Sequence, residues 1–361
     1  MAASMPRWYH LTPDRLVIGL LAAESLLWLS ARFQLFSFTQ HKGWAALVAV
    51  ACAVAFLLLM LLWFVVALLF RMRFQYSIRS LLVLTAAIAV PCGWFSAEFR
   101  KARDQRSAVR ALESAKFGVW YDFQTEPSGK HPPHPPPPGP AWLRRAIGDD
   151  LFEKLLGKDF FADVVAVRSF NYAAADADVQ QVAGFARLRT LTLARTQITD
   201  AAMTCLDGLG ELRELDLRLD DITDAGLAHV ARLTRLECLH LGSTQVTDAG
   251  LGYLEGLTGL QELSVSGKTT DAGLKHLKVL TQLRILHLGG TRITDTGLAE
   301  LEGLTKLQEL DVRVLGITNA GLRHLGAMAD LRLLRIYRGP TMDVALPWLK
   351  KTLPACRVRL N

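Results

Sequence analysis

The sequence lacks the motifs that carry nucleotide, metal and nucleophile chemistry. It has no glycine-rich phosphate loop, no zinc-ligand spacing and no kinase signature, so it implies no cofactor. Only five cysteines occur in 361 residues. Cys52 and Cys92 lie in apolar runs, whereas Cys205, Cys238 and Cys356 form an odd set without pairing or metal-ligand spacing. The cysteines therefore indicate no disulfide framework and no metal site, and they leave the redox compartment open.

A region of concentrated basic charge is also missing. The formal net charge is +7, but residues 160–361 hold 23 Lys and Arg against 23 Asp and Glu. The excess belongs to residues 1–159, which hold 18 basic and 11 acidic residues and where cations flank apolar runs. A nucleic-acid groove needs clustered cations with stacking aromatic side chains. We therefore expect no nucleic-acid partner.

Charge is absent altogether from long runs near the N-terminus. Residues 44–70 are 27 uncharged residues and residues 80–97 are 18 more, and such lengths can cross a hydrocarbon core about 30 Å thick. Residues 16–30 are shorter and contain Glu24. We interpret them as a further span, with an interfacial helix or a signal peptide as alternatives. The prediction is a multi-pass α-helical anchor over residues 1–97 in the cell membrane.

The side of the membrane that the C-terminal half faces depends on the shortest run. If residues 16–30 span, five basic residues on one side oppose seven on the other. If they do not span, nine oppose three, which predicts a cytoplasmic location. Orientation and oligomeric state are therefore left open by the sequence.

Leucine, in contrast, is abundant and follows a repeating pattern. The pattern L-x-x-L-x-L-x-x-T-x-I-T-D-A-G-L-x-x-L-x-x-L-T-x recurs every 24 residues, with one interval of 23. Alternating apolar residues predict a strand, and the helical spacing that follows predicts a helix. One such unit cannot bury both its faces, but stacked copies share a core and form a solenoid. The copies begin at Val164, Leu188, Leu212, Leu236, Leu260, Leu283, Leu307 and Leu331.

This skeleton resembles leucine-rich repeats. The "ITDAGLxxLxxLT" half is similar to a variant in bacterial membrane-anchored leucine-rich-repeat proteins and in the repeat halves of F-box proteins, and it covers residues 164–360. The resemblance implies an α/β solenoid with a curved parallel sheet inside and helices outside, and it implies binding rather than catalysis. The copy at Leu260 is one residue short and lacks the apolar residue that Ile222 or Val246 supplies. A local kink and a ligand notch are both open there.

The other segments predict the domain order around this solenoid, which we place at residues 164–338. Residues 98–127 predict a juxtamembrane helix and strand. The proline-rich residues 128–140 predict an extended spacer, with a ligand for an SH3-like or WW-like domain as the alternative. Residues 141–163 and 339–361 predict the N-terminal and C-terminal caps.

Threonines in the repeats predict structural roles. One set lies in the turn after the strand, where a hydroxyl can bond to the turn backbone. These are Thr196, Thr244 and Thr291. A second set precedes the helix and predicts N-caps, each followed by an acidic residue favoured in a first helical turn. These are Thr199, Thr223, Thr247 and Thr294.

The candidate binding surface lies on the strands. Parallel strands in register place equivalent outward residues on neighbouring rungs about 4.8 Å apart. The position between the second and third strand leucines reads Thr192, Asp216, His240, Ser264, His287, Asp311 and Arg335. We interpret it as a polar recognition stripe on a concave face, and we expect a protein partner at the last three repeats, where Arg and Tyr gather. The candidate residues are Asp216, Arg218, His240, Ser264, His287, Asp311, Arg313, Arg335 and Tyr337.

Two alternative functions remain. Asp216, His240 and Ser264 are the residue types of a hydrolase triad on successive rungs. However, strand amides are already bonded within a sheet, no G-x-S-x-G turn lifts the serine, and His287 with Asp311 would serve equally well. The other alternative is an F-box-like adaptor in protein turnover.

The histidines of the repeats do not have the spacing of a metal site. His240 and His287 would lie two rungs, about 10 Å, apart, which is too far to share an ion. The helix-side residues His229, His276 and His324 are interpreted as solvated or shallowly packed.

Overall fold

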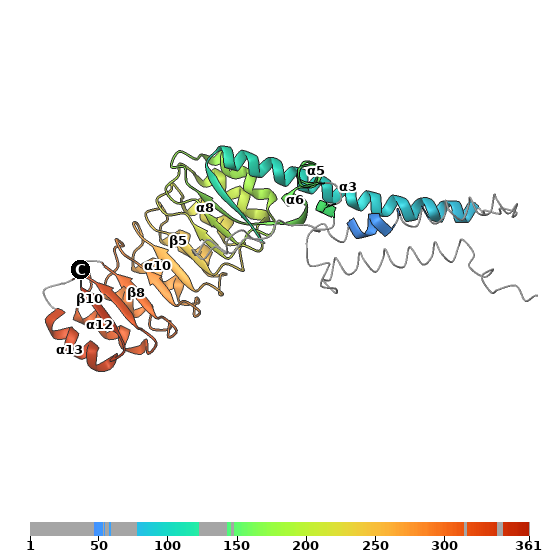
Figure 1. Cartoon of the computed structure of the whole chain (residues 1–361). Coiled ribbons are helices and arrows are strands. Elements are labelled where there is room, and N and C mark those ends of the chain that lie inside the picture. Colours follow the sequence, from blue (N-terminus) through green and yellow to red (C-terminus); the bar gives the residue numbers. More distant parts are fainter. Residues whose placement is uncertain are drawn as a thin grey trace, which may run out of the picture. The chain divides into compact units, whose positions relative to one another are not determined.

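The computed structural model describes residues 47–52, 54, 58, 78–122, 143–145, 148–313, 316–337 and 342–360. The chain divides into two compact units, the N-terminal unit (Met1–Arg106 with His131–Asp163) and the repeat unit (Ser107–Lys130 with Val164–Asn361). Helix α3 (Ile78–Ser114) contributes to both (Figure 1).

The N-terminal unit packs α3 against two short helices, α5 (Asp149–Leu155) and α6 (Lys158–Phe161). Their apolar residues form one cluster beside α3, and the partly buried Arg106 pairs with the buried Asp159 at 3.3 Å. The predicted cap over residues 141–163 falls in this unit. The buried members of the cluster are Ala102, Phe152, Leu156, Phe160 and Phe161.

The predicted membrane spans fall largely outside the described residues. This holds for residues 16–30 and for most of residues 44–70. Residues 80–97 belong to α3, which contains Pro91 and continues past them into a charged stretch. Within the described part of the chain, no helix has both the length and the apolar character that crossing a membrane requires. The prediction of a span over residues 80–97 is therefore not supported.

The repeat unit is built on one sheet of ten strands that lie in sequence order. The second to tenth strands pair in parallel, and the first pairs antiparallel with the second, within the stretch predicted as a juxtamembrane strand. The strands are β1 (Phe117–Tyr121), β2 (Val164–Ser169), β3 (Thr190–Thr192), β4 (Glu214–Asp216), β5 (Cys238–Leu241), β6 (Glu262–Val265), β7 (Ile285–His287), β8 (Glu309–Val312), β9 (Leu333–Ile336) and β10 (Arg357–Leu360).

Short helices follow the strands and cover one face of this sheet (Figure 1). Several of these helices are short 3-10 helices (η). They are α7 (Asp176–Val179), η3 (Gln180–Gly184), η4 (Asp200–Gly208), α8 (Asp224–Val230), α9 (Asp248–Leu251), η5 (Gly252–Leu254), α10 (Asp271–Leu277), α11 (Asp295–Ala299), α12 (Asn319–His324), η6 (Leu325–Ala327) and α13 (Met342–Thr352).

The leucines of the repeat form the core between sheet and helices. Equivalent leucines pair from strand to strand, as Leu239 does with Leu263, and both are fully buried. Each fully buried side chain of this size contributes about 1.5–3 kcal/mol relative to exposure. The predicted α/β repeat architecture is confirmed.

The short repeat keeps this register. Strand β6 pairs residue for residue with both neighbours, so the strand stack has no break there. Thr269 replaces the apolar residue of other copies, is fully buried, and has a hydroxyl without a hydrogen-bond partner. The missing residue therefore leaves the register of the strands unchanged, and the local kink and the ligand notch stay the two interpretations of this repeat.

The "TDAG" stretch links neighbouring repeats beside the helices. In each link, the Asp of one repeat accepts a hydrogen bond from the backbone N–H and another from the hydroxyl of the Thr in the next repeat. For Asp224 and Thr247 these distances are 2.8 and 2.6 Å. The same threonine hydroxyls accept from the helix N-terminus, which confirms the predicted N-caps. We call these links the Asp–Thr ladder: Asp176–Thr199, Asp200–Thr223, Asp224–Thr247, Asp248–Thr270, Asp271–Thr294 and Asp295–Thr318.

The glycine of the same stretch makes room for this ladder. A Cβ atom added at Gly250 would overlap Oδ1 of Asp224 in the preceding repeat, and Gly273 stands in the same way against Asp248. Ala202 occupies the equivalent position in an earlier repeat, and there the helix winds as the 3-10 helix η4. A glycine is thus required at this position because neighbouring repeats approach each other closely there.

Candidate functional site

The register of the strands builds three rows of side chains on the face of the sheet away from the helices, which we call the open sheet face. Along each strand, buried leucines alternate with these positions, as Leu239 and Leu241 alternate with Cys238 and His240. The glutamate row is Glu214, Cys238, Glu262, Ile285 and Glu309. The central row is Thr192, Asp216, His240, Ser264, His287, Asp311 and Arg335. The arginine row, two residues further along, is Arg218, Gly242, Ser266, Gly289, Arg313 and Tyr337.

The predicted order of the central row is confirmed, and the structure lengthens it at both ends. Arg168 of β2 pairs with Thr192, and Arg359 of β10 pairs with Arg335. Arginine therefore ends the row on each side, while its middle carries acidic, histidine and serine side chains.

Two aspartates of the central row are not exposed recognition groups. Asp216 is 5% exposed because Arg218 lies across it, with Nε and a terminal nitrogen at 2.9 and 2.6 Å from the two carboxylate oxygens. Asp311 is 2% exposed beneath Arg313 in the same way, with Nε at 2.9 Å. The bond to Asp216 raises the pKa of Arg218 despite partial burial. The motif E-L-D-x-R thus forms the same internally neutralised pair twice.

The triad of residue types does not assemble into a catalytic arrangement. Both carboxylate oxygens of Asp216 accept hydrogen bonds from Arg218. Nε2 of His240 faces Oε1 of Glu262 at 3.7 Å. Among the described residues, no hydrogen bond joins Asp216, His240 and Ser264. A general base must lie within hydrogen-bond reach of its nucleophile and be oriented by a third group. Neighbouring rungs alone do not supply this geometry.

Cys238, on the glutamate row, is also unsuited to nucleophilic chemistry. Burial, and then the charges of Glu262 and Glu214, raise the pKa of its thiol to about 12. Reactive cysteines instead need a lowered pKa and positive surroundings. This thiol is therefore protonated near neutral pH and acts as a small, partly buried side chain.

The C-terminal end of the open sheet face holds the predicted Arg and Tyr. Arg335 contacts Glu309 at 2.6 Å and lies 3.9 Å from Asp311. His287 reaches the same oxygen of Glu309 at 3.2 Å. Tyr337 is 42% exposed at the end of the arginine row. The structure thus brings most of the candidate residues of this end into one connected polar group, with an exposed aromatic ring beside it.

At the other end, the structure places an aromatic pair that the sequence did not reveal. Trp120 of β1 and Phe170, just after β2, have ring centroids 6.3 Å apart in an edge-on arrangement, and Phe170 is 61% exposed. Gly118 provides the floor, because a Cβ there would lie 2.6 Å from the indole and 2.7 Å from the phenyl ring. The strand-like stretch "FGVWYDF" is the sequence signal, but only the antiparallel pairing of Gly118 with Arg168 puts Trp120 on this face.

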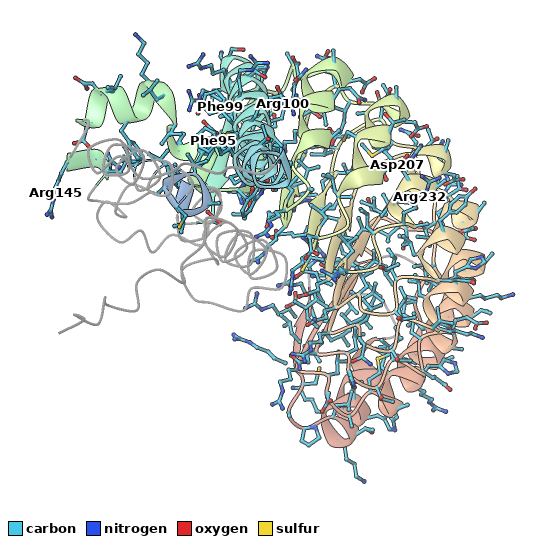
Figure 2. All side chains as sticks on the ribbon, turned by 90° about the vertical axis from the view of Figure 1, so that its right-hand side faces the viewer. Phe95, Phe99, Arg100, Arg145, Asp207 and Arg232 are labelled. Carbon is cyan, nitrogen blue, oxygen red and sulfur yellow. The ribbon has the colours of Figure 1, made fainter. Side chains whose placement is uncertain are left out.

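The helix side of the repeat unit carries a different set of polar contacts. His229 lies 2.9 Å from Asp207, and Arg232 lies 3.1 Å from the same carboxylate. Figure 2 labels Asp207 and Arg232 on this side of the repeat unit. The hydrogen bond from His229 lowers the pKa of Asp207. His276 and His324 face Glu255 and Glu302 at 2.6 Å. These histidines, expected to be solvated or shallowly packed, each pair with an acidic residue of the preceding repeat.

Comparisons with known proteins found one family model and several similar solved structures. A family model described as a leucine rich repeat matches residues 279–301. An internalin (inlF) from Listeria monocytogenes is 26% identical, with 51% of this chain and 50% of that chain covered and a TM-score of 0.42. Internalin C2 (inlC2) from the same organism is 24% identical, with 62% of this chain and 98% of that chain covered and a TM-score of 0.42. The chain thus spans half the length of the first internalin, and no curated protein matches it.

The chain is similar to leucine-rich-repeat proteins in the repeat that contributes β7, where the family model matches. The same order of strand, turn and helix recurs from β2 to β9.

Proposed function

We propose that this protein recognises a macromolecular partner, in the first place another protein, through the open sheet face of its repeat unit, and that it does so without catalysis. The observation that carries the proposal is the contrast within each strand. The buried positions repeat leucine, whereas the open positions change from rung to rung among Glu, His, Arg, Ser and Cys. The fold makes no demand that explains this variety, and a binding surface does.

The two ends of the face have the composition of interaction hot spots. Trp120 and Phe170 lie at one end, and Arg335 and Tyr337 lie at the other. Aromatic and arginine side chains dominate binding energy because they bury large areas and still make polar contacts. A partner that spans the face would therefore be held most strongly at its ends.

Site-specific photo-crosslinking tests the proposal on the full chain in its native host. A benzoyl-phenylalanine in place of Tyr337 reports on the open sheet face, and the same probe in place of Tyr253 reports on the helix side. The two tyrosines are matched controls, since they are 42% and 45% exposed. We expect a discrete adduct from position 337 and none from position 253. Equal labelling from positions 337 and 253, or no labelling from position 337, would contradict the proposal.

The C-terminal end can be tested separately. With the photo-probe in place of Phe170, the double change Arg335→Ala with Tyr337→Ala should reduce adduct formation at least about tenfold, which corresponds to about 1.4 kcal/mol of binding energy. Arg232→Ala with Tyr253→Ala makes the equivalent change on the helix side and should leave the adduct unchanged. An unchanged adduct in the first variant would confine binding to the rest of the face.

The same proposal includes a membrane anchor, supported by the 27 uncharged residues 44–70. A small tag after Asn361, digested by protease in intact and in lysed spheroplasts, tests where the repeat unit lies. Digestion only after lysis indicates the cytoplasm, and digestion of intact cells indicates the outer side. Recovery of the chain in the soluble fraction after high-speed sedimentation would contradict anchoring.

A further inference from the structure

The glutamate row carries carboxylates on every second strand of the open sheet face. Glu214 is on β4, Glu262 on β6 and Glu309 on β8, and the strands between them offer Cys238 and Ile285 at the same position. All three carboxylates are partly exposed. They form a line across the strands with a regular period.

Among the described residues, Glu214 and Glu262 are the glutamates of this row that have no arginine or lysine within ion-pair distance. Asp216 and Asp311 are each neutralised by an arginine of their own strand. Glu214 has the Thr190 hydroxyl at 3.4 Å, and Glu262 has the His240 imidazole at 3.7 Å and the Cys238 thiol at 3.9 Å. Glu309 is shared by His287 and Arg335. Two of the three carboxylates therefore have only neutral or distant neighbours, and a cationic group from outside would complete them.

The spacing of the row matches a helix. Two rungs of a parallel sheet are about 10 Å, and seven residues of an α-helix rise about 10.5 Å and return to the same side. From the glutamate row to the arginine row is four residues of strand, or about 13 Å, which accepts a helix about 10–12 Å wide. Between the two arginines, the arginine row carries only the small residues Gly242, Ser266 and Gly289, and the side chains of Arg218 and Arg313 lie beside the two glycines.

We infer that the open sheet face receives an α-helix of a protein partner that carries Lys or Arg at every seventh residue, lying across strands β4 to β8. This inference rests on the proposed function and specifies the partner's chemistry. Two cations of the helix meet Glu214 and Glu262, and a third lies near Glu309, which Arg335 also contacts. The opposite edge of the helix lies between Arg218 and Arg313. An extended polyproline II segment also returns to one side about every 9 Å, but it leaves most of the width of the face uncovered.

Binding of synthetic peptides to the purified full chain tests this directly. The probe is a fluorescent, lactam-stapled helix with three lysines seven residues apart. Its matched control is the same peptide with the lysines five residues apart, which puts them on different sides of the helix. By fluorescence anisotropy at low salt, the first peptide should bind at least about tenfold more tightly. Equal affinities, or tighter binding of a polyproline II peptide with lysine at every third position, would overturn the inference.

A charge-neutralised variant localises the effect. Glu214→Gln with Glu262→Gln and Glu309→Gln should abolish the preference between the two helical peptides. Glu211→Gln with Glu255→Gln and Glu302→Gln removes the same charge from the helix side and should retain the preference. If the second variant loses it too, the effect comes from net charge alone and the inference fails.

The photo-adduct from position 337 separates this failure from failure of the proposed function. If the adduct persists in the first triple variant while the peptide preference is absent, the open sheet face still binds a partner, but not a basic helix. If the unmodified face gives no adduct at all, the proposed function itself fails.

Discussion

Two regions of the repeat unit, the Asp–Thr ladder beside the helices and the open sheet face, follow the same stack of strands. The ladder repeats one contact six times with the same two residue types and nearly the same distances. The open sheet face changes its chemistry on every strand, from Asp216 through His240 to Ser264. The two regions therefore repeat at the same interval, but only the ladder keeps the same residue types.

The difference shows which positions the fold constrains. A contact that joins one repeat to the next has to recur wherever two repeats meet, because each interface contributes to the stability of the stack. The open positions join nothing to the core, so their identity is free to serve recognition. Changes in the ladder should thus affect folding, and changes on the open face should affect binding.

The largest loss of stability is expected from replacing a glycine that lies against an aspartate of the Asp–Thr ladder. Gly250→Ala places a Cβ against Oδ1 of Asp224 and should lower the free energy of unfolding by about 3 kcal/mol. Gly256→Ala is the control, since no atom lies within 4 Å of its Cβ position, and it should stay within about 0.5 kcal/mol. Urea denaturation followed by circular dichroism measures both. A neutral Gly250→Ala would mean that the repeat relaxes, as the helix around Ala202 does.

Removing a ladder carboxylate should cost somewhat less. Asp224→Ala leaves the backbone N–H and the hydroxyl of Thr247 without their acceptor and should lower the free energy of unfolding by about 2 kcal/mol. Ser264→Ala, on the open face, should change it by less than about 0.5 kcal/mol. Similar values for the two variants would break the distinction between the regions.

A buried carboxylate in the turn after β4 predicts a dependence on pH. Burial, opposed by hydrogen bonds from Thr196, raises the pKa of Asp220 from 3.8 to about 7. The folded state then holds a proton that the unfolded state has lost, so stability falls as pH rises from about 4 to about 7. Asp220→Asn should remove this fall and be more stable by about 2 kcal/mol at about pH 8, with no gain at about pH 4. Thermal unfolding across this range measures it, and a gain at every pH would exclude titration as the cause.

The smallest expected effect is an increase in the free energy of unfolding. Thr269→Val removes a buried hydroxyl that has no partner and should raise the free energy of unfolding by about 1 kcal/mol. Thr244→Val is the matched control, since that buried hydroxyl donates to the Leu241 carbonyl at 2.8 Å, and it should be destabilising. If both changes acted in the same direction, hydrogen bonding would not be the deciding factor.

Periodicity made the larger part of the fold predictable. Because parallel strands stack in register, the leucine spacing alone ordered Asp216, His240 and Ser264 on one row, as the structure has them. The threonine N-caps followed in the same way from local helix signals. These features depend on contacts close in sequence or related by the repeat.

Other features needed the side chains of neighbouring repeats to be placed. Sequence reasoning read Asp216 and Asp311 as exposed members of the stripe, and the structure buries them under Arg218 and Arg313. The signal available in the sequence was an arginine two residues after each of these aspartates. The side chain of Arg218 lies beside Gly242 of the next repeat, so its position could be seen only once that repeat was placed.

The sequence by itself determined the repeat, the leucine core and the order of residues on the open sheet face, because these follow from a period and the pleat of a strand. Only the tertiary structure decided that Asp224 reaches Thr247 of the next repeat and that Trp120 meets Phe170. The reason is physical. These contacts join residues whose separation in the chain varies from 23 to 50 positions, and their geometry depends on how one repeat settles on the next and on the antiparallel pairing of β1.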